Sequence, residues 1–202
     1  MRSALAAGWR RRDLYWERLQ EAGNAAILAG DIRGAGRAWH RAAWIARLAF
    51  AASDPRQATT LANLACLDRQ AGREARAKKR YVKARARWQQ AETFIAGMTI
   101  ARRGRSSMFH LRMEVLHWDT YENNMRIRLR KFAGETADAL AALEQNRTPD
   151  CRLFERWRGE KPSVFDDTRK FLSAALLIGG GAQSPKNSNL KKPSSKEEAN
   201  AT

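Results

Sequence analysis

Three side chains of the sequence have the types and spacing of metal ligands. His110, Glu114 and His117 recur at helical spacing, and the last two form the Glu-x-x-His pattern of carboxylate-bridged metal sites. Such a site needs a second Glu-x-x-His and further carboxylates from other helices, but the sequence has one other histidine, His40. We therefore expect no metal and no cofactor, and we interpret the pattern as a polar helix face.

Covalent catalysis has no better support in the sequence. Neither Cys66 nor Cys151 has a histidine beside it, and the chain contains no GxSxG, Walker A or GxGxxG motif. The glycine run 179–181 lacks the Lys-Ser/Thr pair that a phosphate-binding loop requires. The sequence is therefore predicted not to be an enzyme.

Charge narrows the class of partner. The 202 residues include 38 Lys+Arg and 21 Asp+Glu, which gives a net charge of +17. Such an excess attracts anionic partners, whether acidic protein, nucleic acid or anionic lipid. The sequence lacks both the apolar run of a membrane span and the apolar region of a signal peptide, so we expect a cytoplasmic protein.

The elements that would present these side chains are helices. Apolar residues recur at helical spacing from Asp13 to Trp88, and glycines at 30 and 72 divide the stretch into two helical hairpins. The hairpins repeat with an offset of 42 residues, with small residues beneath one aromatic ring in each. The repeat residues are Gly23, Gly30, Ala35, Trp39 and Ala42 in the first unit and Ala65, Gly72, Ala77, Tyr81 and Ala84 in the second.

These positions resemble the signature of the tetratricopeptide repeat, a family whose usual period is about 34 residues. The longer spacing here, and the stretch 54–65 that opens the second unit, are similar to the repeats of the kinesin light chain type. The first unit departs from the pattern at Ala26, where a tyrosine is usual. The resemblance covers residues 16–90 and implies an all-α helical-hairpin array that binds another protein.

The resemblance also implies where a partner binds. In the family, the first helix of each hairpin lines a concave groove that holds a peptide or helix. The implied groove residues are Gln20, Asn24, Ile27 and Leu28 from the first unit and Ala62, Asn63, Cys66, Arg69 and Gln70 from the second. A carboxamide can bond both the N–H and the C=O of a peptide backbone, which draws attention to Asn24 and Asn63, although either side chain could equally cap a turn or face water.

A second interpretation uses the densest basic run, 73–87. Its buried stripe turns the cations outward, and Arg76, Arg80, Lys83 and Arg87 then form a basic face. Such a face fits nucleic acid, or simply solvent. Nucleic-acid binding also calls for exposed stacking aromatics, whereas Tyr81 and Trp88 are explained more simply as core.

The remaining segments are predicted from composition and periodicity. Residues 1–12 form an N-terminal extension to the hairpins at 13–96. Residues 106–146 hold a long amphipathic helix, 107–133, that caps the array, and a short helix that has Thr136 as its N-cap and ends near Asn146. Residues 147–178 form an irregular segment and a short amphipathic helix, and 179–202 are expected to be disordered.

Taken together, the sequence predicts an all-α protein that acts as a non-enzymatic adaptor or scaffold. The expected partner is an acidic peptide or helix in the groove, with RNA or DNA on the basic face as the alternative. Such arrays usually have three or more repeats, so an array of two leaves the apolar face at one end exposed. Either the capping helix or self-association into a homo-oligomer could cover that face.

Overall fold

The computed structural model describes residues 2–100, 111–149 and 166–179, with the side chains of residues 4–100, 122–149 and 166–179. Within these ranges the regular structure is helical and contains no strand. The helices are α1 (Arg2–Ala6), α2 (Arg11–Leu28), α3 (Ile32–Ala49), α4 (Pro55–Gln70), α5 (Glu74–Gln89), α6 (Ala91–Ala96), α7 (Leu111–Glu144) and α9 (Asp167–Leu176). The predicted all-α class is confirmed.

Glycines end the first helix of each hairpin. Gly30 and Gly72 adopt left-handed backbone conformations, with φ of 77° and 71°. The following amide then turns back into the preceding helix, as when Asp31 N–H donates to the carbonyl of Ala26 at 2.8 Å. A glycine at this position satisfies the last carbonyls of a helix at little steric cost, which explains why both predicted breaks fall where they do.

Close packing holds the first hairpin together. A Cβ placed on Gly23 of α2 would lie 2.2 Å from Nε1 of Trp39 on α3, so only glycine leaves room for the indole. Trp39 is fully buried, as is Tyr81 at the matching position of the second hairpin. The predicted pairing of a small residue with a large ring is thus realised in the first hairpin.

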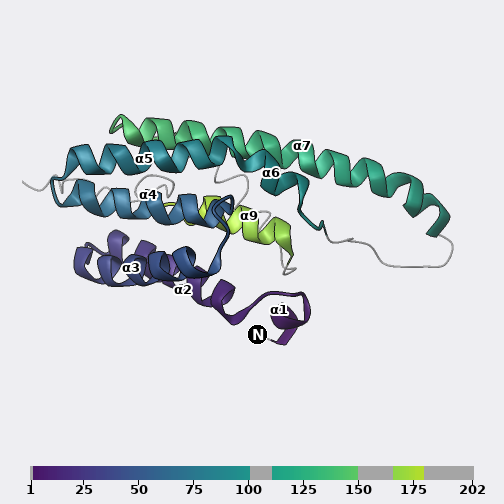
Figure 1. Ribbon diagram of the computed structural model, residues 1–202, viewed down its shortest axis with the longest axis horizontal. Helices are drawn as coiled ribbons and strands as arrows, with labels where there is room; N and C mark the ends of the chain where they lie inside the picture. The colour runs from purple at the N-terminus through teal and green to yellow at the C-terminus, as the bar shows by residue number, and fades with distance from the viewer. Residues whose placement is uncertain (1, 101–110, 150–165, 180–202) are drawn as a thin grey trace, which may run out of the picture.

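The helices stack in layers (Figure 1). The α4–α5 hairpin lies between the α2–α3 hairpin and α7, which runs along α5. The sequence predicts a break before Thr136, but α7 continues through it to Glu144. Thr136 is fully buried, and its hydroxyl donates to the carbonyl of Phe132 at 2.7 Å inside the helix, so it does not act as an N-cap.

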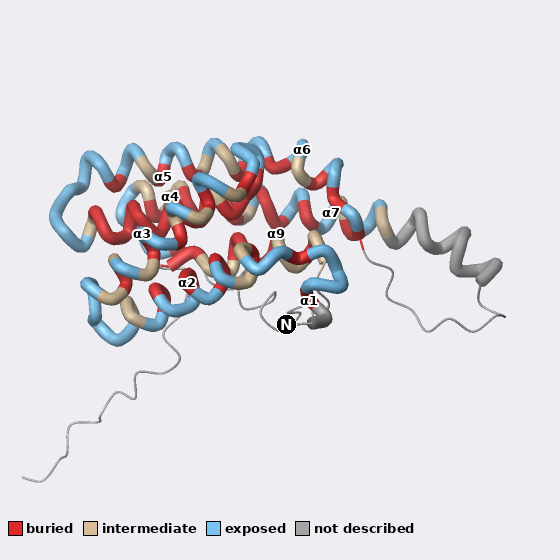
Figure 2. Tube along the Cα trace, turned by 60° about the horizontal axis from the view of Figure 1, so that its bottom comes forward, coloured by how far each residue is buried: buried red, intermediate tan, exposed pale blue. Residues whose placement is uncertain are grey.

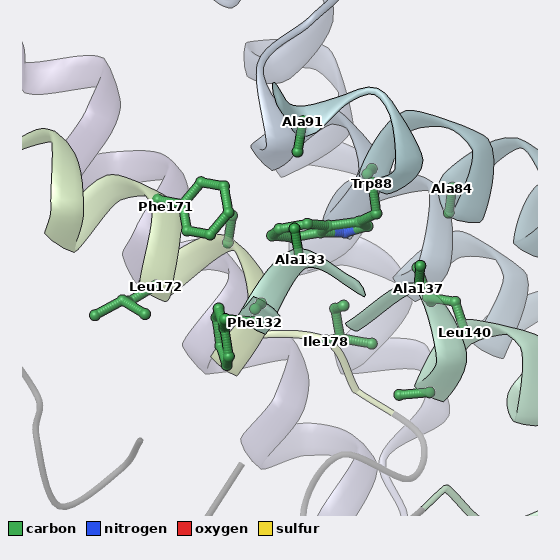
Figure 3. Close-up of a cluster of buried hydrophobic side chains, with 14 of the residues drawn as sticks. Ala84, Trp88, Ala91, Phe132, Ala133, Ala137, Leu140, Phe171, Leu172 and Ile178 are labelled. Atoms are coloured by element: carbon green, nitrogen blue, oxygen red, sulfur yellow. The ribbon is translucent and has the colours of Figure 1, made fainter. Parts of the chain in front are cut away.

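The largest core forms where α4, α5, α7 and α9 meet (Figure 2). Phe171 of α9 lies edge-on to Trp88, with ring centroids 5.2 Å apart, and also contacts Phe94 and Phe132. Figure 3 shows Phe171, Leu172 and Ile178 among the buried side chains of α5 and α7. Helix α9, the last of the described helices, is therefore part of the main core. Its N-cap is Asp166, whose carboxylate accepts a hydrogen bond from the amide of Arg169.

Candidate functional site

The two asparagines singled out by the sequence face the same piece of chain. Asn24 of α2 is 4% exposed and Asn63 of α4 is fully buried. Both contact the residues that follow α9, Leu177 to Gly179. We call these two asparagines, with the backbone they hold, the clamp.

Asn63 bonds the backbone on both sides of Ile178. Its Nδ2 donates to the carbonyl of Leu177 at 3.0 Å, and its Oδ1 accepts from the amide of Gly179 at 2.7 Å. Asn24 Nδ2 donates to the same Leu177 carbonyl at 3.0 Å. A single carboxamide thus satisfies the Leu177 carbonyl and the Gly179 amide, a backbone acceptor and a backbone donor just beyond the end of α9.

Neighbouring polar groups fix the orientation of Asn63. Its second Nδ2 hydrogen points to Gln20 Oε1, at an N–O distance of 2.6 Å. Gln20 Nε2 in turn donates to the Thr60 hydroxyl at 3.2 Å, which also accepts from Trp16 Nε1 at 3.1 Å. Because Gln20 and Leu177 both require a donor, the amide nitrogen of Asn63 has one consistent position.

Helix α9 is held by side chains of α2 and α4 as well. The Thr59 hydroxyl donates to the carbonyl of Ala174. Glu17 accepts from the Ser173 hydroxyl at 2.5 Å and lies 3.4 Å from the guanidinium of Arg169. The surface of α2 and α4 therefore places the Glu17 carboxylate opposite Arg169, and Asn24 and Asn63 opposite the backbone of residues 177–179. We call this surface the α2/α4 site.

Gly179 packs closely against Asn24 and Trp39. A Cβ at this position would be 2.8 Å from Asn24 Oδ1 and 2.9 Å from Trp39 Cζ2. Both distances are shorter than a Cβ normally keeps from another heavy atom, and Trp39 is fully buried, so a side chain at position 179 would force its neighbours to shift. Asn24 Oδ1 and Trp39 Nε1 are buried and make no hydrogen bond within the described ranges, so the clamp is tightly packed but not fully bonded.

The other residues of the implied groove have varied surroundings. Ala62 and Cys66 are buried, Ile27 is half-buried, and Leu28 and Gln70 are exposed. Burial raises the pKa of the Cys66 thiol, although the charge of nearby Arg69 acts in the opposite direction.

Arg69 is directed away from the clamp. It donates to the carbonyl of Leu143 at the end of α7, at 2.6 Å, and contacts Glu74. Its guanidinium also lies over the Tyr81 ring. The α2/α4 site thus contains Gln20, Asn24 and Asn63 from the predicted set, while Arg69 joins α4 to α7.

The predicted basic face is largely engaged within the protein. Arg76 and Arg80 both pair with the buried carboxylate of Asp68, at 3.2 and 2.7 Å. Arg87 donates to the Gln57 carboxamide at 3.1 Å, whereas Lys83 is exposed. Asp68 also pairs with Arg73, so this one carboxylate binds three arginines, two of which, Arg76 and Arg80, belong to the predicted basic face.

A second buried ion pair anchors the start of α4. Arg56 lies 2.5 Å from Asp13 and 2.6 Å from Asp54, and its guanidinium stacks on the Phe50 ring. Two carboxylates raise the pKa of Arg56 despite its burial. This cluster joins the beginning of α2 to α4 and thereby sets the spacing of the α2/α4 site.

The sequence analysis did not predict that residues 166–179 lie on the α2/α4 site. It also did not identify Glu17 and Thr59, which contact this segment, or Asp68, which pairs with the arginines of α5. The available signal was the short amphipathic helix predicted within 147–178, whose apolar face needed another surface to pack against. The Glu114–His117 pattern lies on α7, but its side chains fall outside the described set, as does His110. Among described residues no cluster of His, Cys, Asp and Glu could hold a metal ion.

Comparison with protein-family models, curated proteins and solved structures finds no match to the chain. The described helices include none with the length and hydrophobicity to cross a membrane. The site must therefore be interpreted from its own chemistry.

Proposed function

We propose that the protein is a non-enzymatic protein-binding adaptor built on tetratricopeptide-like hairpins. Its α2/α4 site would bind a partner segment consisting of a short helix followed by extended backbone. The observation that carries this proposal is the two-sided bond of Asn63 to the Leu177 carbonyl and the Gly179 amide. Backbone bonds of this kind recognise a peptide largely without regard to its side chains.

The chain's own residues 166–179, which we call the C-terminal segment, indicate what the site accepts. Its helix presents small and apolar side chains to the core and places Arg169 near Glu17. Gly179, three residues after the helix ends, packs against Asn24. A partner that replaces this segment should therefore be an amphipathic helix with a cation in its first turn and a glycine after its end. At this position the proposal departs from the acidic partner expected from net charge, because the carboxylate, Glu17, is on the adaptor and calls for a cation on the partner.

In this proposal the C-terminal segment is an internal competitor. A tethered segment has an effective concentration on the order of millimolar, so a partner must bind more tightly or be present in excess. The segment also buries Phe171, Leu172 and Ile178, each worth about 1.5–3 kcal/mol of transfer free energy. A partner must supply equivalent apolar groups to displace it.

A fluorescein-labelled peptide of residues 166–179 tests the proposal by anisotropy against the full-length chain. The Gly179→Ala chain should bind the peptide at least tenfold more tightly than the native chain, because the added Cβ weakens only the internal segment. Gly36→Ala is the matched control, since a Cβ there meets no atom within 4 Å. A peptide carrying Gly179→Ala should bind poorly to every chain.

Adding Asn63→Ala to the Gly179→Ala chain should abolish the tighter binding. Circular dichroism of each variant checks that helicity is kept. If the native peptide binds none of the chains, the C-terminal segment is a fixed part of the core and the adaptor proposal fails at this site.

A further inference from the structure

The outward face of α3 combines exposed arginines with an exposed tryptophan. Residues at helical spacing place five side chains in one stripe, which we call the α3 outer face: Arg33, Arg37, Arg41, Trp44 and Leu48. Trp44 is 68% exposed and Leu48 is 63% exposed. The opposite stripe, which includes Trp39 and Ala42, is fully buried, so α3 cannot rotate to hide the exposed one.

The cations of this face lack partners in the described part of the chain. Helix α3 contains no Asp or Glu. Its Arg33, Arg37 and Arg41 make no side-chain ion pair or hydrogen bond with any described residue. By contrast, arginines of α5 share Asp68, and Arg56 holds two carboxylates.

This arrangement is electrostatically unfavourable without a ligand. Arg33, Arg37 and Arg41 follow one another at i, i+4 spacing, and like charges at that spacing destabilise a helix. They rise about 6 Å per step along the helix axis. An anionic chain laid along α3 would relieve this repulsion, and the exposed indole beyond Arg41 offers a flat apolar surface beside it.

The chemistry of the face favours one class of anionic partner. A membrane surface calls for a broad apolar face, and only Trp44 and Leu48 are apolar here. A second copy in symmetric contact would set arginine against arginine. A stable acidic protein partner needs roughly 800 Å² on each side, more than one convex helix face readily supplies. Single-stranded nucleic acid needs only spaced cations for its phosphates and an aromatic ring for a base.

We propose that the α3 outer face binds single-stranded nucleic acid, with phosphates on Arg33, Arg37 and Arg41 and a base stacked on Trp44. Arginine suits both tasks, because its planar guanidinium binds phosphate with two parallel hydrogen bonds and stacks on bases. This surface is separate from the α2/α4 site. Its test is therefore independent of whether the α2/α4 site binds a peptide.

Binding of a labelled twelve-nucleotide oligothymidylate to the full-length chain, followed by anisotropy between 0.05 and 0.2 M salt, tests the proposal. Trp44→Ala should weaken binding about tenfold, and Trp44→Phe should restore most of the affinity, because stacking depends on an aromatic face. Arg37→Gln with Arg41→Gln should lower the slope of log affinity against log salt by about 1.4, at about 0.7 per phosphate contact.

The matched control is Lys78→Gln with Lys79→Gln on α5, which removes the same charge from exposed positions of another helix. This control should change affinity by less than threefold. An equal loss in the two double variants would overturn the proposal in favour of attraction by net charge alone. Absence of oligonucleotide binding at 0.05 M salt, or Trp44-dependent binding of polyglutamate or anionic vesicles in its place, would overturn it as well.

Discussion

The carboxamide of Asn63 and the amide of Gly179 are joined by a 2.7 Å hydrogen bond across 116 positions of sequence. The bond connects the second helical hairpin to Gly179, three residues after the last described helix ends at Leu176. Together with the bond from Asn63 to Leu177, it fixes the direction in which the chain leaves α9. The Asn63 carboxamide, a group able to bond the backbone of a partner peptide, thus bonds the backbone of this chain.

The two asparagines of the clamp should contribute unequally to stability. Asn63→Ala leaves the Gly179 amide without its acceptor and should cost about 2–4 kcal/mol. Asn24→Ala should cost about 1 kcal/mol or less, because Leu177 keeps its bond from Asn63 and the buried, unbonded Oδ1 of Asn24 is removed. Urea unfolding of the two variants measures the difference. Equal losses would mean that Asn63 does not hold both backbone groups.

The aromatic ring of α9 should be one of the largest single contributors to the core. Phe171 is fully buried among Trp88, Phe94 and Phe132, so Phe171→Ala should lower the free energy of unfolding by about 3–5 kcal/mol. Leu28→Ala is the control, since that side chain is 65% exposed and its loss should matter by less than about 0.5 kcal/mol. A loss at Phe171 no greater than this control would place α9 outside the core.

Stability should fall at alkaline pH partly through Cys66. Burial raises the pKa of this thiol in the folded chain, whereas the unfolded thiol ionises near its ordinary value of about 8.5. Its contribution is therefore fully present below that value and is lost as pH rises towards the folded pKa, by up to about 1.4 kcal/mol per pH unit.

Unfolding between pH 8 and 10 measures this effect by comparing Cys66 with Cys66→Ala, both in a Cys151→Ser background. The chain that retains Cys66 should lose stability more steeply. Parallel slopes would show that the folded thiol ionises as readily as the unfolded one, contrary to its 4% exposure.

Local patterns predicted the hairpins because local chemistry determines them. Gly30 and Gly72 end helices through a backbone conformation that other residues rarely adopt. The Trp39 indole packs so closely against α2 that only glycine fits at position 23. Asn63 was recognised as a group able to bond backbone on both sides. Whether an external partner uses it stays a prediction.

The pairings that the sequence did not reveal are long-range or depend on which face a residue occupies. The sequence around Asn63 does not indicate that it contacts Leu177, because the period and spacing of apolar residues describe one helix at a time. Asp68 collects Arg73, Arg76 and Arg80 only after the α4–α5 turn folds, so a helix that seems free and basic is partly neutralised. Thr136 resembles an N-cap by type, but it is buried within a continuous helix.

Hydrogen exchange of residues 166–179 in the full-length chain, with and without excess unlabelled peptide of the same sequence, tests the central claim most directly. The account predicts that α9 and the Gly179 amide are protected in the chain alone. It further predicts that they lose protection when the peptide occupies the α2/α4 site, while α4 stays protected. Protection of α9 that saturating peptide leaves unchanged would contradict an exchangeable site and assign the clamp to the fold alone.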